Sequence, residues 1–226
     1  MNNKTDVLFK CLNLYKIYKN KSILKNINLT LKKNETIAIK GISGSGKSTL
    51  LNILSGFDSS YFGQVYYKNI NWKEIKNKHK YIIRKKNIGF IYQFHYLLPE
   101  FSIIENISMP LIINNIKKKQ VYEMSYALLK KIGLENKCNM KPFQLSGGEK
   151  QKISLGRSII MKPDCIIADE PTGNLDTCSS LEIVNQLLEI NRKDNTAVVL
   201  VTHDNFISNF MKKKYILKKG YLERVY

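Results

Sequence analysis

The sequence predicts an α/β protein whose core is a parallel sheet, with an antiparallel sheet before it and a block of helices inserted into it. Three observations predict this class. A short β-branched strand, 36–39, runs directly into a glycine-rich turn and an apolar helix. Two further apolar strands, 165–169 and 197–202, follow much later. Between these halves, 119–132 has apolar residues at helical spacing and stops at Gly133. A chain of 226 residues can bury one such core.

The composition excludes some classes of protein. Lysine and arginine outnumber aspartate and glutamate by 37 to 18, a net charge of +19, but the lysines are scattered in pairs and triplets. We therefore attribute the charge mainly to composition, with attraction to a membrane surface as a minor contribution, and expect no nucleic-acid partner. No apolar run reaches the roughly 20 residues that span a bilayer, and we expect no secretory leader. Four cysteines without CxxC spacing predict free thiols in a reducing cytoplasm.

The N-terminal part alternates apolar and polar residues as strands do. Residues 7–31 predict two antiparallel strands with a turn at 19–21, and 63–67 predicts a further edge strand. Tyr18 lies in this first turn, where an aromatic ring is able to stack on a nucleotide base. Tyrosines are also common in strands, so the pattern alone leaves both interpretations of Tyr18 open.

The turn after strand 36–39 carries the most specific motif that can be identified from the residues alone, before any family is considered. Residues 41–48, GISGSGKS, match the phosphate-loop pattern G-x-x-x-x-G-K-[ST] between a strand and a helix. Glycines let the backbone N–H groups point at phosphates, and the helix start adds a positive dipole end. We expect Lys47 to reach the β- and γ-phosphates and Ser48 to bind Mg²⁺. The residues assigned to the nucleotide here are Gly41, Ser43, Gly44, Ser45, Gly46, Lys47, Ser48 and Thr49.

The middle of the chain is predicted to be largely helical. A basic, helix-compatible stretch, 73–86, precedes a strand, 87–93, that ends in the amide of Gln93. Pro99 and Pro110 interrupt the next segment. With the motif above, the fold predicted is a phosphate-loop NTPase (RecA-like) core with an N-terminal antiparallel β-subdomain and an inserted α-helical subdomain. Its boundaries are predicted as 1–93 and 161–226 for the core and 94–160 for the helical insert.

Two carboxylates end the strand 165–169. Asp169 is expected to bind Mg²⁺, and Glu170 to act as the general base that polarises an attacking water. A strand-ending surface turn is the alternative, which an upstream phosphate loop disfavours. The strand 197–202 ends at His203. A single histidine is more often structural, but at the carboxyl end of a parallel strand it is a candidate sensor of the γ-phosphate.

A second phosphate-binding motif lies far from the first. Residues 145–151, LSGGEKQ, open a helix and offer a hydroxyl, backbone N–H groups and a helix dipole to an anion. The motif resembles the signature of ABC transporter ATPases. That resemblance implies two ATP molecules held between two subunits of a head-to-tail homodimer. Each signature then serves the ATP of the opposite subunit through Ser146, Gly147, Gly148 and Glu149.

The resemblance extends over the whole chain and implies further assignments. Tyr18 matches the aromatic that stacks on adenine, and Gln93 matches the Q-loop amide, which also binds Mg²⁺. Asp169 matches the magnesium aspartate, Glu170 the catalytic base and His203 the switch histidine. Residues 174–176 match the D-loop. The cofactors implied are ATP and Mg²⁺, and the catalytic residues are Lys47, Gln93, Glu170 and His203.

Within this family the chain is most similar to the ATPases of lipoprotein-releasing systems. The run 91–101, IYQFHYLLPEF, is the specific part, while 168–176, ADEPTGNLD, is shared with macrolide-export and cell-division ATPases. This implies ATP hydrolysis that drives lipoproteins from the bacterial inner membrane toward the outer membrane. The subunit would work peripherally at the cytoplasmic face with two integral membrane permease subunits, meeting the membrane surface only indirectly. A macrolide-export or cell-division ATPase is the first alternative, and a soluble ABC protein acting on nucleic acid or ribosomes the second.

One position departs from the family pattern. Gly156 stands in the signature helix, where a glycine costs about 1 kcal/mol relative to alanine. We expect it to soften that helix without removing a phosphate ligand.

Overall fold

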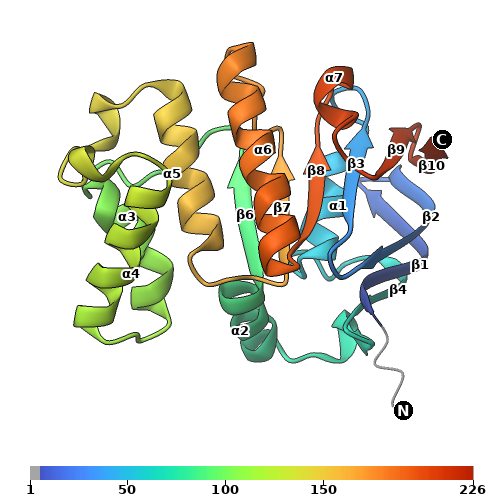
Figure 1. Cartoon of the computed structure of the whole chain (residues 1–226). Coiled ribbons are helices and arrows are strands. Elements are labelled where there is room, and N and C mark those ends of the chain that lie inside the picture. Colours follow the sequence, from blue (N-terminus) through green and yellow to red (C-terminus); the bar gives the residue numbers. More distant parts are fainter. Residues whose placement is uncertain (1–5, 226) are drawn as a thin grey trace.

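The computed structural model describes residues 6–225, so the outermost residues of the predicted core, 1–5 and 226, lie outside the described part (Figure 1). One sheet is antiparallel with strand order β2-β1-β4-β5. Its strands are β1 (Val7–Tyr18), β2 (Lys21–Lys32), β4 (Phe62–Tyr67) and β5 (Ile70–Asn71). The prediction that 63–67 is an edge strand was wrong. β4 pairs with β1 on one side and with the two-residue β5 on the other, and so short a strand leaves no alternation to recognise.

The second sheet has strand order β10-β9-β3-β8-β7-β6. Pairing is parallel from β9 to β6, and β10 alone is antiparallel. The carboxyl ends of the parallel strands therefore meet at one edge, where α/β proteins bind their ligands. The strands are β3 (Thr36–Lys40), β6 (Ile88–Tyr92), β7 (Cys165–Asp169), β8 (Ala197–Val201), β9 (Lys213–Lys218) and β10 (Tyr221–Val225).

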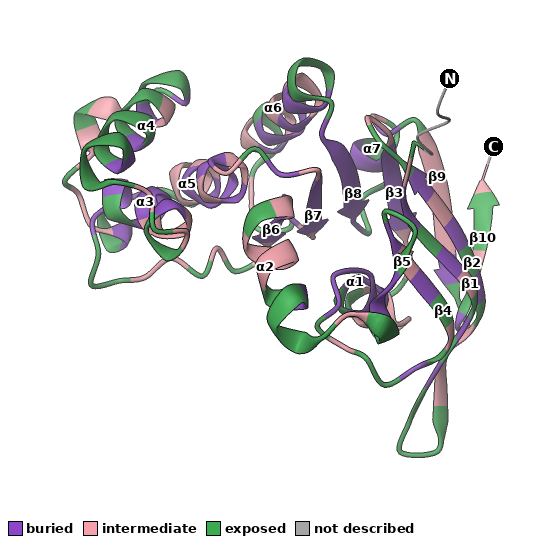
Figure 2. Cartoon of the chain, turned by 90° about the horizontal axis from the view of Figure 1, so that it is seen from below, coloured by how far each residue is buried: buried purple, intermediate pink, exposed green. Residues whose placement is uncertain are grey.

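Both faces of this parallel sheet are buried. Helix α1 (Lys47–Leu54) lies between the two sheets, as the view from below shows (Figure 2). Helices α6 (Thr177–Asp194) and α7 (Asn205–Ser208) cover the opposite face. Alternate residues of β8 accordingly enter different cores: Val199 packs with α1, and Val198 packs with α6. Strands that are buried on both faces have continuous apolar sequences. For this reason the sequence predicted 165–169 and 197–202 as strands.

The remaining long helices form a separate apolar cluster at one end of the molecule (Figure 1). They are α3 (Ile103–Ile113), α4 (Lys118–Lys131) and α5 (Gly147–Ile159). Helix α3 runs through Pro110, which we expected to interrupt the segment. A capping box between Ser102 and Glu105 fixes its start, and a buried apolar face holds it against α4 and α5. Capping and packing therefore outweigh the hydrogen bond that the proline removes.

Helix α2 (Asn77–Asn87) and three short 3₁₀ turns, Trp72–Glu74, Glu135–Lys137 and Pro142–Gln144, complete the described elements. Within residues 6–225, no helix combines the length and the apolar character needed to cross a membrane. All four cysteines are free thiols. Burial raises the pKa of the Cys11 thiol to about 12, so this group stays protonated and unreactive at neutral pH.

Two glycines let α5 sit close to its neighbours. A Cβ at Gly89 of β6 would overlap the carbonyl oxygen of Ser158, so α5 packs directly on the edge strand. A Cβ at Gly156 would lie 3.2 Å from Cδ1 of Ile107 on α3. The glycine that we expected only to soften the signature helix is thus a site of close helix–helix packing.

A carboxylate joins the two sheets at the edge opposite the carboxyl ends. Asp164, just before β7, accepts hydrogen bonds at Oδ2 from the Tyr67 hydroxyl (2.7 Å), Lys68 Nζ (2.8 Å) and Asn87 Nδ2 (2.7 Å). Burial acts to raise the pKa of Asp164, but the hydrogen bonds from Lys68 and Tyr67 and the Lys68 charge hold it below its usual value. The ionised form is therefore the one that the fold favours.

Candidate nucleotide site

The loop between β3 and α1 folds as its glycines require. A Cβ at Gly41 would lie 2.6 Å from both the Leu217 carbonyl oxygen and Ser45 Oγ. Gly46 precedes α1 with φ of 102°, in the left-handed region, and a Cβ there would lie 3.0 Å from Ile23. Both the close packing and the positive φ exclude larger residues, and the result is a loop whose backbone turns inward above the start of a helix.

This loop forms one wall of an open cavity of about 850 Å³ at the carboxyl ends of the parallel strands. The cavity brings together residues from five separate parts of the chain. Those that the sequence predicted are Ser43, Gly44, Gly46, Lys47, Ser48, Thr49, Gln93, Asp169, Glu170 and His203. Those that it did not single out are Ile23, Ile42, Tyr92, Phe94 and Tyr96. Gly41 and Ser45, which the sequence also predicted, do not line this cavity.

Two oxygens suited to a hard cation meet inside the cavity. Ser48 Oγ donates a hydrogen bond of 2.7 Å to Asp169 Oδ2, which joins the first turn of α1 to the end of β7. Burial raises the pKa of Asp169, and the neighbouring Glu170 carboxylate adds to the rise, while Ser48 and Lys47 oppose it. A partly buried carboxylate beside a second carboxylate is a site where a bound cation relieves unfavourable charge.

The Lys47 ammonium is held at the mouth of its own loop. Its Nζ donates to the carbonyl oxygens of Gly41 at 2.8 Å and Ile42 at 3.0 Å. It therefore stands beside the inward-facing backbone of the loop, without a carboxylate within ion-pair distance in residues 6–225.

Glu170 and His203 lie in contact at the ends of adjacent strands. Glu170 Oε2 lies 3.0 Å from His203 Nδ1 and accepts from the His203 backbone N–H at 3.3 Å. Glu170 has φ of 49°, an uncommon value for a residue with a side chain, and its backbone N–H donates to the Val201 carbonyl. Such strain is held by the flanking β7 and β8 strands, and it aims the carboxylate into the cavity.

The segment after β6 is fastened to α5. The Arg157 guanidinium donates to the carbonyl oxygens of Tyr96 at 2.7 Å and His95 at 2.8 Å. The His95 imidazole also hydrogen-bonds the backbone of Gly147, and burial together with the Lys150 charge lowers its pKa. Gln93 begins this segment inside the cavity. A displacement of Gln93 would therefore move a segment that hydrogen bonds of Arg157 and His95 connect to the signature helix, α5.

Tyr18 lies in a smaller adjoining hollow. At the end of β1 its ring is 61% exposed, and it lines this hollow with Lys16, Asn52 and Asp58. Ile23 and Thr49 line both this hollow and the main cavity. Tyr18 therefore lies outside the main cavity but beside it. Ile23 of β2 is a neighbouring residue that the sequence did not predict.

The signature motif lies outside the cavity of its own chain. Ser146 caps α5, its Oγ accepting from the Glu149 N–H at 3.3 Å. The Glu149 carboxylate turns back to the Ser146 N–H and to Lys137 Nζ, so it stabilises the start of the helix. Gly148 lies close to Ser179 of α6, where a Cβ would meet Oγ at 3.0 Å. The exposed Ser146 and Gly147 therefore face solvent as an open helix N-terminus.

A phosphate loop, a strand ending in Asp-Glu, a neighbouring strand ending in histidine and a separate LSGG helix start together define an ATPase of the ATP-binding-cassette class. The sequence profile of the ABC transporter family matches residues 24–173, and this chain belongs to that family. The α/β phosphate-loop fold predicted from the sequence is thereby confirmed, as are the ATP-hydrolysing class and the family resemblance.

The chain is similar over nearly its full length to named relatives. It is 41% identical over 221 residues to the lipoprotein-releasing system ATP-binding protein LolD of Legionella pneumophila, covering 96% of this chain and 97% of that one. It is 44% identical over 226 residues to LolD of Wigglesworthia glossinidia brevipalpis, covering 98% of both. Among solved structures, a dimeric ATP-binding cassette bound to ADP and Pi in a post-hydrolysis state has TM-score 0.88 and 35% identity, covering 97% of this chain and 99% of that one.

Proposed function

We propose that this chain is the ATPase subunit of a transporter that releases lipoproteins from the bacterial inner membrane toward the outer membrane. The observation that carries the proposal is the likeness to LolD proteins at 41–44% identity over almost the whole of both chains. The contact between Glu170 and His203 inside the cavity supports the ATP-hydrolysing part of the proposal.

The residues of the cavity have distinct parts in the proposed hydrolysis. Lys47 and the backbone N–H groups of the loop neutralise and hold the β- and γ-phosphates. Glu170 orients the attacking water and accepts its proton, and His203 contacts both Glu170 and the γ-phosphate region. Tyr18 stacks on the adenine from the adjoining hollow. Positioning and charge neutralisation do most of the catalytic work in such a reaction.

The ends of α1 and β7 fit a magnesium ion. The Ser48 hydroxyl and the Asp169 carboxylate converge to 2.7 Å, Gln93 lines the same cavity, and such oxygen donors with phosphate oxygens suit Mg²⁺. Bound there, the ion would neutralise charge that develops on the phosphate oxygens. Ser48, Asp169 and Gln93 would hold it.

The open signature supports a head-to-tail homodimer with two ATP molecules between the subunits. Ser146, Gly147 and Gly148 do not line the cavity of their own chain, and we infer that they serve the γ-phosphate in a second copy. We place the dimer at the cytoplasmic face of the inner membrane, with two permease subunits as partners. The segment fastened by Arg157 to the signature helix would pass the state of the nucleotide site to those subunits.

Depletion of the protein in its own cells tests the proposal. We expect lipoproteins of the outer membrane to accumulate in the inner membrane, and the wild-type chain, but not Glu170→Gln, to restore their release. Co-purification of two permease subunits with the tagged chain is the expected biochemical counterpart. Normal lipoprotein localisation combined with loss of macrolide resistance or of cell division would contradict the lipoprotein assignment and leave the ATPase assignment standing.

A further inference from the structure

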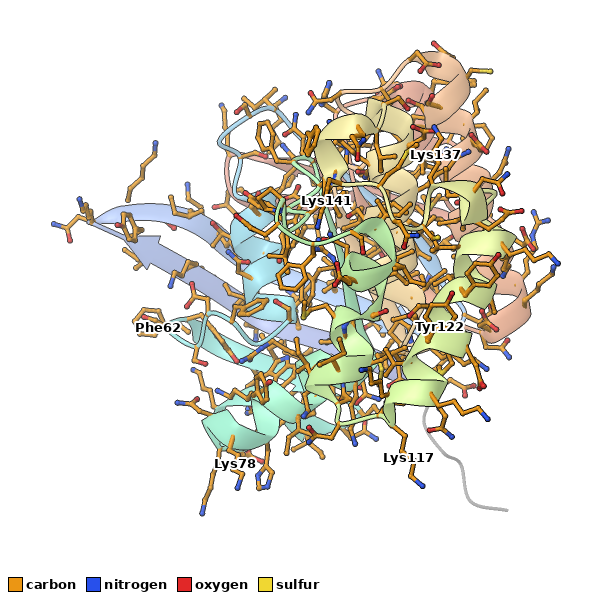
Figure 3. The ribbon with its side chains drawn as sticks, turned by 90° about the vertical axis from the view of Figure 1, so that its left-hand side faces the viewer. Phe62, Lys78, Lys117, Tyr122, Lys137 and Lys141 are labelled. Carbon is orange, nitrogen blue, oxygen red and sulfur yellow. The ribbon has the colours of Figure 1, made fainter. Side chains whose placement is uncertain are left out.

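Helix α4 is the outermost element of the helical cluster, and among residues 6–225 nothing packs on one side of it. Its inner side packs on α3 through Val121, Ser125 and Leu129, and Ser125 Oγ lies 2.8 Å from Ser108 Oγ. Figure 3 looks onto this end of the molecule, with Tyr122 on α4 and Lys117 at its start. The outer side is exposed along its whole length.

Two tyrosines form the centre of this outer side. Tyr122 is 59% exposed, Tyr126 is 39% exposed, and their rings stack at 6.0 Å with an interplanar angle of 12°. They are one helical turn apart, so they cover the same side of α4. Two large rings that stack in solvent on one side of a helix form a small patch, unlike the single scattered residues that need no explanation.

Lysines flank the tyrosines at both ends. Lys117, Lys118 and Lys119 begin the helix, and Lys130 stands in its last turn, all of them exposed. Within residues 6–225, no hydrogen bond, ion pair or aromatic ring holds their ammonium groups. Two nearby lysines of the same helical region are held: Lys137 pairs with Glu149, and Lys141 donates to the Glu100 carbonyl oxygen. Glu123 is the acidic residue that α4 itself contributes.

We propose that this α4 ridge, defined as Lys117–Lys119, Tyr122, Tyr126 and Lys130, binds the headgroup region of an anionic phospholipid bilayer. Unpaired lysines match the negative charge of such a surface, and tyrosines favour the boundary between headgroups and acyl chains. The chain would then touch the membrane directly, in addition to any contact through permease subunits. The inference needs no permease and stands apart from the proposed transport function.

Flotation of the purified full chain with vesicles tests the ridge. We compare vesicles of phosphatidylcholine alone with vesicles that also contain phosphatidylglycerol. We expect binding to the anionic vesicles only, weakening as salt is added. Lys118→Glu with Lys119→Glu should lower the partition coefficient more than tenfold, since each lysine near such a surface contributes roughly fivefold. Acidic residues in the first turn suit a helix, so α4 should remain folded.

A matched control separates the ridge from net charge. Lys218→Glu with Lys219→Glu makes the same change in charge at the exposed β9–β10 turn, at the opposite end of the molecule (Figure 1). We expect this control to bind within about twofold of wild type, whereas Tyr122→Ser with Tyr126→Ser should lose roughly fivefold with its salt dependence retained. ATP hydrolysis in solution should be unchanged in all three and reports an intact fold.

Three results would overturn the proposal. Wild type that binds neither kind of vesicle, or both equally, has no anionic-lipid surface. A control that loses as much binding as the Lys118/Lys119 variant would assign the effect to overall charge. Binding of wild type to single-stranded RNA in preference to the vesicles, lost with the Lys118/Lys119 changes, would make the ridge a nucleic-acid surface. If the charge reversal abolishes ATP hydrolysis, Lys118→Gln with Lys119→Gln takes its place in the same comparison.

Discussion

The two phosphate-binding motifs of this chain have opposite surroundings. Both use the N-terminus of a helix and both depend on glycine. The loop 41–48 is enclosed by its own chain, which brings Asp169, Glu170 and His203 to the same cavity. The signature at 146–149 has a well-capped helix behind it and solvent in front. One motif is thus enclosed beside two carboxylates and a histidine, and the other offers only a helix end. This difference is the basis of the head-to-tail dimer that we propose.

The largest expected effect is at the enclosed loop. Lys47→Ala should lower ATP hydrolysis by about 10³-fold, because the loop loses its cation for the developing phosphate charge. The fold should persist, since the Lys47 side chain bonds, among residues 6–225, only to two carbonyl oxygens of its own loop. Steady-state ATPase assays and thermal melts check both parts. Activity at the wild-type level would remove the basis of the phosphate-loop assignment.

Glu170→Gln separates binding from hydrolysis at the same site. The amide keeps the size of the side chain but accepts no proton, so hydrolysis should fall by about 10²-fold or more while ATP still binds. Because ATP then stays between two copies, the variant should form an ATP-dependent dimer that ADP does not support. Gel filtration with each nucleotide measures this. Normal hydrolysis would show that Glu170 is not the base, and lost hydrolysis without a dimer would place the pairing under the control of the membrane subunits.

Ser146→Arg tests whether the open motif serves another chain. Ser146→Arg alone and Lys47→Ala alone should each be inactive, the first because arginine obstructs the signature. Mixed together, they should regain part of the activity, since one site of the mixed dimer combines an intact loop with an intact signature. Titration of one variant into the other measures the recovery. A mixture as inactive as its components would argue against sites shared between copies.

Asp164 tests how the two sheets behind the enclosed loop are joined, at the edge away from that loop. Asp164→Ala leaves Tyr67, Lys68 and Asn87 without their common acceptor, and we expect a loss of roughly 2–3 kcal/mol in unfolding free energy. The fold holds the pKa of Asp164 below its usual value. The contribution of the ionised carboxylate to the unfolding free energy is therefore fully present above the pKa that Asp164 has in the unfolded chain. That contribution is lost as the pH falls through the lower pKa of the folded chain. Denaturant unfolding from neutral to acid pH should therefore show a shallower acid loss for Asp164→Asn than for wild type.

Gly156 tests the framework of the open motif and should give the smallest effect. Alanine gains about 1 kcal/mol in helix propensity but places a Cβ 3.2 Å from Ile107 in a packed core. These terms oppose each other, so we expect a change in unfolding free energy within about 1 kcal/mol of zero. Gly156→Val should be clearly destabilising. Stabilisation by both substitutions would show that the α3–α5 contact is loose.

The sequence predicted the parts of the site that lie on specific motifs or at the ends of apolar strands. Lys47, Ser48, Asp169, Glu170, Gln93 and His203 all reach one cavity because each follows a strand of the same parallel sheet or the loop above it. Ile23 and Tyr96 were missed because they reach the cavity from a hairpin and from a loop, and their residue types signal only burial. Their places depend on tertiary packing.

Other elements were missed although the sequence held a signal. The capping box Ser102-x-x-Glu105 marks the start of α3, although Pro110 in the same segment predicts an interruption. Asp176 marks the start of α6, where it accepts from the Ser179 N–H at 3.0 Å. The strands β9 and β10 are partly exposed and carry charged residues, with three lysines in β9 and Glu223 and Arg224 in β10, so their alternation is weak. In this chain, capping residues predict where helices begin more reliably than a proline predicts where a helix is interrupted.

The pairing of β3 has a consequence for how the chain folds. The strand that carries the phosphate loop lies between β8 and β9, and Thr36 pairs with Val198 while Ile37 pairs with Lys213. Both neighbours are synthesised more than 150 residues after β3 itself. Helices α3, α4 and α5, by contrast, come from one continuous stretch and fold through local contacts. During translation the helical cluster should therefore form while β3 still lacks both partner strands. Nucleotide binding should then be gained last. Until β3 is paired, this apolar strand depends on protection from aggregation.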